Sequence, residues 1–131
     1  MAKTVRADKM AAEINKILRE YETASEEAVA AAVRMTAADT VKDIRNSARE
    51  QFGGTGEYAS SWAQKAEKRR NAYTRIVYAR EPYYRLTHLL ENGHAKVNGG
   101  RVEGRPHIAP AANEAPAKLT RYIKLMMEGI K

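Results

Sequence analysis

Apolar residues recur at helical spacing through the first fifty residues of the chain. They form one stripe that comprises Ile14, Leu18, Tyr21, Ala28, Val29, Val33, Ala37, Val41, Ile44 and Ala48. No glycine or proline interrupts the segment before Gly53, so the pattern predicts a long helix within residues 1–50. Such a helix would be about 60 Å long, roughly twice the width of a small domain. Part of it must therefore overhang the domain or fold back.

Two alternatives to a single continuous helix stay open. Thr23 and Glu26 have the spacing of a capping box, which would allow a break near Tyr21–Ser25. The apolar stripe nevertheless crosses this point in phase, which favours a continuous helix with at most a kink. A coiled coil is the other alternative, but fewer than three clean heptads support it.

Residues 51–82 are expected to form a β-hairpin. The glycines of Gln51–Glu57 end the helix, and Glu81-Pro82 closes the second strand because a residue before proline avoids the helical region. Between them, alternating residues predict two strands joined by a basic turn. The residues expected to share a strand face are Tyr58, Ser60 and Trp62 in the first strand, and Tyr73, Arg75, Val77 and Ala79 in the second, with Ile76 and Tyr78 on its opposite face.

The remaining chain predicts a short helix and loop over residues 83–109 and a C-terminal helix over 110–131. The short helix would run from Tyr83 to Glu91. The Gly-rich loop that follows contains Asn98-Gly99, a strong turn dipeptide, which would make Val97 and Val102 cross-strand neighbours. The last helix has a stripe of Ala111, Ala115, Leu119, Tyr122, Ile123 and Met126.

Together these elements predict one α+β domain spanning residues 1–131. A long N-terminal helix and a C-terminal helix would pack on one side of a small antiparallel β-sheet that carries a Gly-rich loop. Seven of the nine aromatic residues are tyrosines, which suit half-buried sites and interfaces, so we expect a modest core that depends on partner subunits. No segment has the apolar length of a signal peptide or a membrane span, so we expect an intracellular protein without a membrane partner.

The net charge of +7 is concentrated in the second part of the chain. Residues 1–50 contain nine basic and nine acidic side chains, whereas residues 51–131 contain fourteen basic and seven acidic ones. The basic set is Lys65, Lys68, Arg69, Arg70, Arg75, Arg80, Arg85, Lys96, Arg101 and Arg105. It could dock on acidic proteins, contact DNA phosphates with Tyr73, Tyr83 and Tyr84 stacking on bases, or simply be solvated.

The motifs of catalytic and metal sites are incomplete in this chain. His88, Glu91 and His94 are spaced three apart, but positions six apart diverge around a helix and Gly93 would end it, so we expect no metal site. Gly53–Gly56 lacks the lysine of a phosphate loop, and Ser60-Ser61 lies outside a nucleophile elbow. The absence of cysteine excludes thiol chemistry. We therefore expect neither a cofactor nor an enzymatic activity.

The order of three short elements resembles a known family. They are Tyr83-Tyr84, then Leu90-Glu91-Asn92-Gly93-His94, then the run from Arg105-Pro106-His107 to Pro110-Ala111. This arrangement is similar to the tail-completion or head–tail joining proteins of long-tailed bacteriophages, typified by the lambdoid Hong Kong phage. His107 and Asn92 depart from the pattern, because both positions are commonly phenylalanine in that family.

The resemblance implies a structural virion protein at the phage neck, which would reach the virion from the host cytoplasm. It would complete the tail or join tail to head as part of a homo-oligomeric, six-fold ring, beside head-completion, tail-terminator or tail-tube proteins and near genomic DNA. The long helix and the Gly93–His107 loop would provide its interfaces. The interface residues expected are Tyr83, Tyr84, Glu91, Gly93, His94, Gly99, Gly100, Arg101, Arg105, Pro106 and His107. A sequence-independent DNA-binding protein that uses the basic residues is the alternative.

Overall fold

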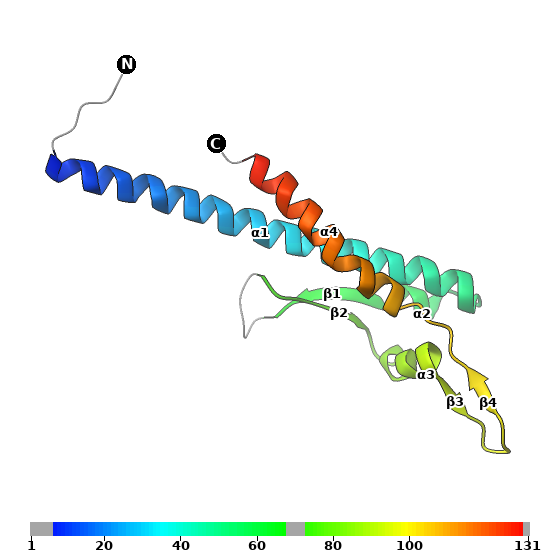
Figure 1. Cartoon of the computed structure of the whole chain (residues 1–131). Helices are drawn as coiled ribbons and strands as arrows, with labels where there is room; N and C mark the ends of the chain where they lie inside the picture. Colours follow the sequence, from blue (N-terminus) through cyan, green and yellow to red (C-terminus); the bar gives the residue numbers. More distant parts are fainter. Residues whose placement is uncertain (1–6, 68–72, 130–131) are drawn as a thin grey trace.

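The computed structural model describes residues 7–67 and 73–129 and confirms an α+β fold (Figure 1). Two long helices, α1 and α4, lie on one side of a β-hairpin, and a second hairpin projects at the end of the molecule opposite the N-terminus of α1. The elements are α1 (Ala7–Phe52), α2 (Glu57–Ser60), β1 (Trp62–Ala66), β2 (Arg75–Ala79), η1 (Tyr83–Leu86), α3 (Thr87–Asn92), β3 (Gly93–Ala95), β4 (Arg101–Glu103) and α4 (Ala109–Glu128).

Helix α1 is continuous through the position where a break was considered. The Ser25 hydroxyl donates to the carbonyl of Tyr21 at 2.9 Å, one helical turn back. The first part of the stripe is nevertheless solvent-exposed: Ile14, Leu18 and Tyr21 have relative exposures of 50, 60 and 54 %. The stripe becomes buried from Ala28 onward. Helix α1 therefore overhangs the domain at its N-terminal end, as its length requires.

Helix α4 runs antiparallel to α1 and packs closely on its small residues. Ala32 is fully buried in the middle of α1, and Ala111 is buried near the start of α4. Polar contacts along the same interface join Lys118 to Asp43 and the Tyr122 hydroxyl to Asp39. Small side chains allow the two backbones to approach, and the flanking polar pairs fix the position of one helix along the other.

The β1–β2 hairpin packs one face on the helices. Its register pairs Trp62 with Ala79 and Gln64 with Val77, so these residues lie on one face of the sheet. Trp62 and Ala79 join Val41, Ile44 and Ala111 in the core. The guanidinium of Arg45 in α1 also donates through Nε to the Trp62 carbonyl at 3.0 Å. The predicted alternation of β2 is thus confirmed.

The expectation that Tyr58 and Ser60 belong to the first strand is wrong. They lie in the short helix α2, and β1 begins only at Trp62. Gly56 adopts a φ of 80°, which starts a helical turn in which the Ser60 N–H donates to the Gly56 carbonyl at 3.0 Å. This turn directs the Tyr58 ring toward Phe52 instead of along a strand.

The glycine-rich loop forms a hairpin, but its register differs from the prediction. His94 pairs with Val102, whereas Val97 lies in the loop and is completely exposed. The Lys96 N–H donates to the Gly100 carbonyl at 3.0 Å, so the turn closes one residue pair later than Asn98-Gly99 alone suggested. The short helix starts as the 3₁₀ turn η1 before α3, and α4 has the predicted stripe. Lys68, Arg69 and Arg70 lie outside the described residues.

The close helix contact at Ala32 gives a stability prediction. Ala32→Leu would insert a branched side chain into a fully buried position, and we expect it to lower the free energy of unfolding by about 1–3 kcal/mol. Ala38→Leu makes the same chemical change on the exposed side of α1 and should alter stability by less than about 0.5 kcal/mol. Urea denaturation followed by circular dichroism compares the two. Equal effects would contradict close packing at Ala32.

Candidate functional site

The second hairpin forms an arm that projects from the body of the molecule (Figure 1). We define the arm as residues 93–103, which include β3, β4 and the loop between them. Apart from Gly93, its residues are exposed, and Val97 at the tip makes no burial at all. Lys96 and Arg101 place positive charge on it, and Glu103 lies at its base. A protruding, apolar and charged element of this kind is suited to contact another molecule.

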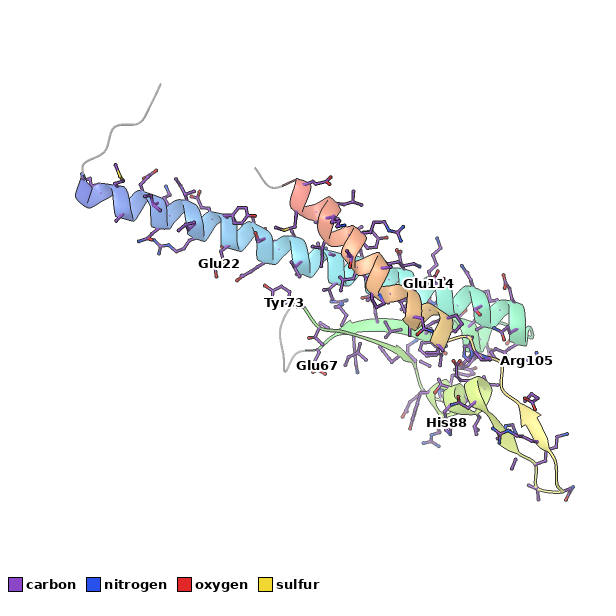
Figure 2. The ribbon with its side chains drawn as sticks, viewed as in Figure 1. Glu22, Glu67, Tyr73, His88, Arg105 and Glu114 are labelled. Carbon is purple, nitrogen blue, oxygen red and sulfur yellow. The ribbon has the colours of Figure 1, made fainter. Side chains whose placement is uncertain are left out.

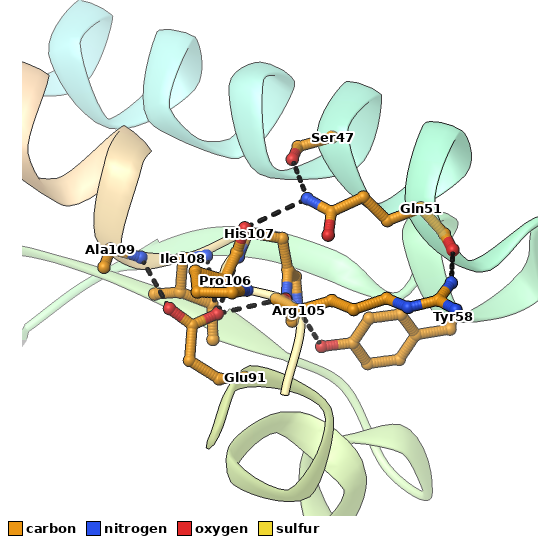
Figure 3. A network of polar contacts seen from close by, with 9 residues as sticks. All are labelled: Ser47, Gln51, Tyr58, Glu91, Arg105, Pro106, His107, Ile108 and Ala109. Carbon is orange, nitrogen blue, oxygen red and sulfur yellow. Dashed lines mark hydrogen bonds and ion pairs between the residues drawn. The ribbon is translucent and has the colours of Figure 1, made fainter. Parts of the chain in front are cut away.

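Glu91 fixes the base of the arm to the start of α4. Its Oε1 accepts hydrogen bonds from the backbone N–H groups of His107 at 2.8 Å and Ile108 at 2.9 Å, and its Oε2 accepts from Ala109 at 2.9 Å (Figure 3). The first N–H groups of a helix have no partner within the helix and carry partial positive charge. The carboxylate therefore acts as a cap that α4 lacks in its own sequence, because the Ile108 side chain cannot supply one.

His107 is fully buried beneath this cap. Its Nδ1 lies 3.0 Å from Glu91 Oε1 and 3.0 Å from the Arg105 carbonyl, so both neighbours are acceptors and Nδ1 carries a proton. In neutral His107, Nε2 then accepts from the Tyr58 hydroxyl at 2.6 Å. The ring also packs edge-on against Phe52, with centroids 4.9 Å apart. His107 thus fills an aromatic position in the interior, and its assignment to an exposed interface was wrong.

Further backbone contacts hold the strands that enter and leave the arm. The Arg105 N–H donates to the Leu90 carbonyl at 2.8 Å, and Arg101 Nη2 donates to the Asn92 carbonyl at 2.7 Å. Gln51 of α1 donates to the Pro106 carbonyl at 2.9 Å, and the Arg105 guanidinium donates to the Gln51 carbonyl (Figure 3). The predicted residues Arg105 and Pro106 therefore join the arm to the end of α1.

The environment of Glu91 lowers its pKa. Burial alone would raise the pKa, but the three backbone donors and the positive charge that His107 carries when protonated outweigh this effect. The carboxylate stays ionised, and it is committed to the backbone of residues 107–109. Within the described part of the chain, no group of three acidic or histidine side chains has the arrangement of a metal site.

The basic residues do not form one surface. Lys65 lies on the outer face of the sheet, with Nζ 4.8 Å from the centre of the Tyr78 ring. Arg75 lies on the inner face and donates to Gln64 Oε1 at 3.1 Å. Arg80 donates to the Ser60 carbonyl at 2.9 Å. These side chains therefore point in different directions.

The predicted tyrosine pair is also divided. The Tyr83 hydroxyl donates to Glu57 Oε2 at 2.6 Å, and this hydrogen bond is the largest contribution to its raised pKa. Tyr84 is 44 % exposed and lies beside the outer face of the sheet. Only Tyr84 of this pair has the exposure of a contact residue.

A family model described as "Bacteriophage HK97-gp10, putative tail-component" matches residues 8–93, which is more than half of the chain. The chain belongs to this family. The match includes α1, the β1–β2 hairpin, η1 and α3, and it ends at Gly93, the first residue of the arm. No curated protein and no solved structure matches the chain significantly. The HK97-gp10-like assignment identifies the chain as a phage tail component and thus as a virion protein.

Sequence patterns did not identify the partners of His107. Tyr58 is 49 residues away along the chain, and Gln51 is 55 residues from Pro106. No periodicity or short motif connects such positions. The aromatic content of Phe52, Tyr58 and Trp62 was visible, but their convergence on one histidine depends on the turn at α2, which had been assigned to a strand. The two long helices also contain no stretch apolar enough to cross a membrane, within the residues described.

The bonds of Glu91 make stability depend on pH in a defined direction. A lowered folded-state pKa contributes stability that is present above the unfolded pKa and is lost as pH falls through the folded pKa. We expect Glu91→Gln to lower the free energy of unfolding by about 2 kcal/mol at pH 7, because bonds to a charged acceptor are weakened. The difference between wild type and variant should shrink as pH falls below the ordinary value of 4.5. Urea midpoints at several pH values test this, and a pH-independent difference would contradict it.

The base of the arm also depends on Gly104. A Cβ at this position would lie 2.5 Å from the Glu91 carbonyl oxygen, so Gly104→Ala must displace the backbone. We expect the Arg105 amide, which donates to Leu90, to exchange with solvent at least about 10-fold faster in this variant. Gly100→Ala is the control, because a Cβ there meets no atom within 4 Å, although its φ of +79° adds local strain. Unchanged Arg105 exchange in Gly104→Ala would show that the arm base tolerates movement.

Proposed function

We propose that this phage tail component acts at the neck, where it completes the tail or joins the tail to the head. The observation that carries the proposal is the arm, a projecting hairpin whose base is tied to α1, α3 and α4 by Glu91 and Arg105. An element that is exposed at its tip and fixed at its base can dock without ordering the whole segment on contact, which reduces the entropic cost of binding. The family assignment supports a partner within the virion.

The partners proposed for the arm are neighbouring neck or tail proteins: head-completion, tail-terminator or tail-tube proteins. Lys96 and Arg101 favour an acidic rim on such a partner, and Val97 supplies a central apolar contact. The chain itself is proposed to form a homo-oligomeric ring, for which the resemblance to tail-completion proteins suggests six copies. Closing a ring requires two different matching surfaces on each subunit.

DNA binding is the weaker proposal. The opposite directions of Lys65 and Arg75 on the sheet argue against one strip of phosphate contacts in the described part of the molecule. A position near the DNA channel remains compatible with a ring at the neck, but the geometry favours docking on protein as the main function.

The neck function is tested by deleting the gene in its parent phage or prophage and imaging the lysate by negative-stain electron microscopy. We expect separate filled heads and unjoined tails, or tails with faulty ends. Complementation with Val97→Asp should fail, with titre reduced at least about 100-fold, because a charge replaces the apolar contact at a hot spot. Val97→Asp should unfold at the same urea concentration as wild type, since Val97 is fully exposed.

The control for complementation is Ala95→Asp, which adds the same charge at an exposed position nearer the base of the arm. Its titre should fall less than that of Val97→Asp. Intact, infectious particles from the deletion would overturn the neck function, and normal titre with Val97→Asp would show that the tip of the arm is not a docking surface.

A further inference from the structure

The large apolar side chains exposed on the described residues fall mainly into two groups. One group lies on the N-terminal overhang of α1, which we define as residues 9–27: Met10, Ile14, Ile17, Leu18 and Tyr21. The other lies below the helices: Tyr73, Tyr84 and Leu86 beside the outer face of the sheet, and Val97 and Val102 on the arm. Exposed groups of this kind mark contact surfaces in soluble proteins.

The overhang has the spacing of a helix-packing seam with an acidic edge. Met10, Ile14, Ile17, Tyr21 and Ala24 alternate in steps of four and three residues, and the series continues to the buried Ala28. Glu13, Glu20 and Glu27 follow one edge of this seam at seven-residue intervals, and the opposite edge is uncharged: Ala11, Leu18 and Ser25.

These charges disfavour pairing of two overhangs with each other. In an antiparallel pair the glutamate edges would face one another, and in a parallel pair they would face the uncharged edge. Neither arrangement gives an ion pair across the seam. The acidic edge therefore favours a basic surface as its partner.

The seam of the overhang also points away from the hairpin of its own chain. Glu22 and Glu26 are on the side of α1 that faces the hairpin, since partial burial and then the charges of Glu26 and Glu22 raise the pKa of Tyr73 (Figure 2). At 3.6 residues per turn, these glutamates lie roughly a third to a half of a turn from the seam. Helix α4 covers α1 only from Ala28 onward, so the seam is open.

The outer face of the β1–β2 hairpin offers a basic surface with an apolar floor. Ile76 and Tyr78 point away from the core, and with Tyr84 they line a shallow hollow. Lys65 and Arg80 stand at its rim, and Arg85 lies beside Tyr84, with its guanidinium 5.7 Å from the centre of the ring. Half-buried tyrosines bordered by cations are well suited to receive apolar side chains flanked by carboxylates.

We propose that the overhang of α1 in one copy of the chain docks on the outer face of the β1–β2 hairpin in the next copy. Glu20 and Glu27 would face Lys65 and Arg85, and Ile14, Ile17 and Tyr21 would pack on Tyr78 and Tyr84. The proposal rests on the proposed ring, and it assigns the two surfaces that the ring requires. Because these surfaces differ and cannot meet within one chain, the contact is heterologous and propagates from copy to copy. The arm remains available for other virion proteins.

Charge reversal on each surface tests this contact in the full-length chain. The overhang variant carries Glu20→Lys and Glu27→Lys, and the sheet variant carries Lys65→Glu and Arg85→Glu. Sedimentation velocity at low salt, up to about 1 mM protein, measures association. Each variant alone should associate at least about 10-fold more weakly than wild type, because like charges then face each other. A 1:1 mixture of the two should recover association, since each contact again pairs opposite charges.

The control reverses two exposed carboxylates away from both surfaces, Glu50→Lys and Glu128→Lys, and should associate like wild type. Wild-type protein that stays monomeric, or a mixture that does not recover association, would overturn the proposal. Undiminished association of the sheet variant would show that overhangs pair with each other instead.

Cysteine trapping locates the contact independently, because the natural chain has no cysteine. Ile17→Cys mixed with Tyr84→Cys should form a disulfide-linked dimer under mild oxidation, whereas Ile17→Cys mixed with Ala38→Cys should not. Absence of the first dimer would count against the assigned surfaces. Failure here leaves the neck function standing if the gene deletion still yields unjoined heads and tails. Infectious particles from the deletion would remove the neck function whatever the chain does in solution.

Discussion

The carboxylate of Glu91 is the interaction on which the arrangement of this molecule depends. It is placed at the end of α3 and binds three consecutive N–H groups at the start of α4, so one side chain joins the segments on either side of the arm. The buried His107 ring below it touches Phe52 at the end of α1 and Tyr58 of α2. Without this cap, the N-terminus of α4 would have unpaired donors next to a buried ring, and the arm would have no fixed base.

The elements that the sequence predicted well are those whose pattern persists over many residues. Helices α1 and α4 each repeat the 3.6-residue period through several turns, so single misplaced residues do not obscure it. The segment at Tyr58–Ser60 failed because four residues cannot distinguish alternation from one helical turn, and the positive φ of Gly56 decided between them. The register of the arm failed for a related reason, since adjacent glycines allow the turn to close at more than one position.

The candidate site shows a different limit. The resemblance to tail-completion proteins selected Glu91, Gly93, Arg105 and His107, and all four are central to the structure of the arm base. It assigned them to an interface, however, whereas Glu91 and His107 bind residues of their own chain. A motif indicates that positions matter without indicating whether they contact a partner or hold the element that does. Only the burial of His107 and the long-range bonds to Gln51 and Tyr58 separate these two roles.

The extent of the family match bears on how the two kinds of contact are divided. Residues 8–93 contain both the overhang of α1 and the β1–β2 hairpin, whereas all of the arm beyond Gly93 and the whole of α4 follow the matched segment. Self-association through the first two would therefore use surfaces within the matched segment, and docking through the arm would use one outside it. Separate surfaces allow a change in the arm to alter the docking partner without disturbing contacts between copies. The anchor at Glu91 makes this separation physically possible, because it isolates the exposed tip from the packing of the body.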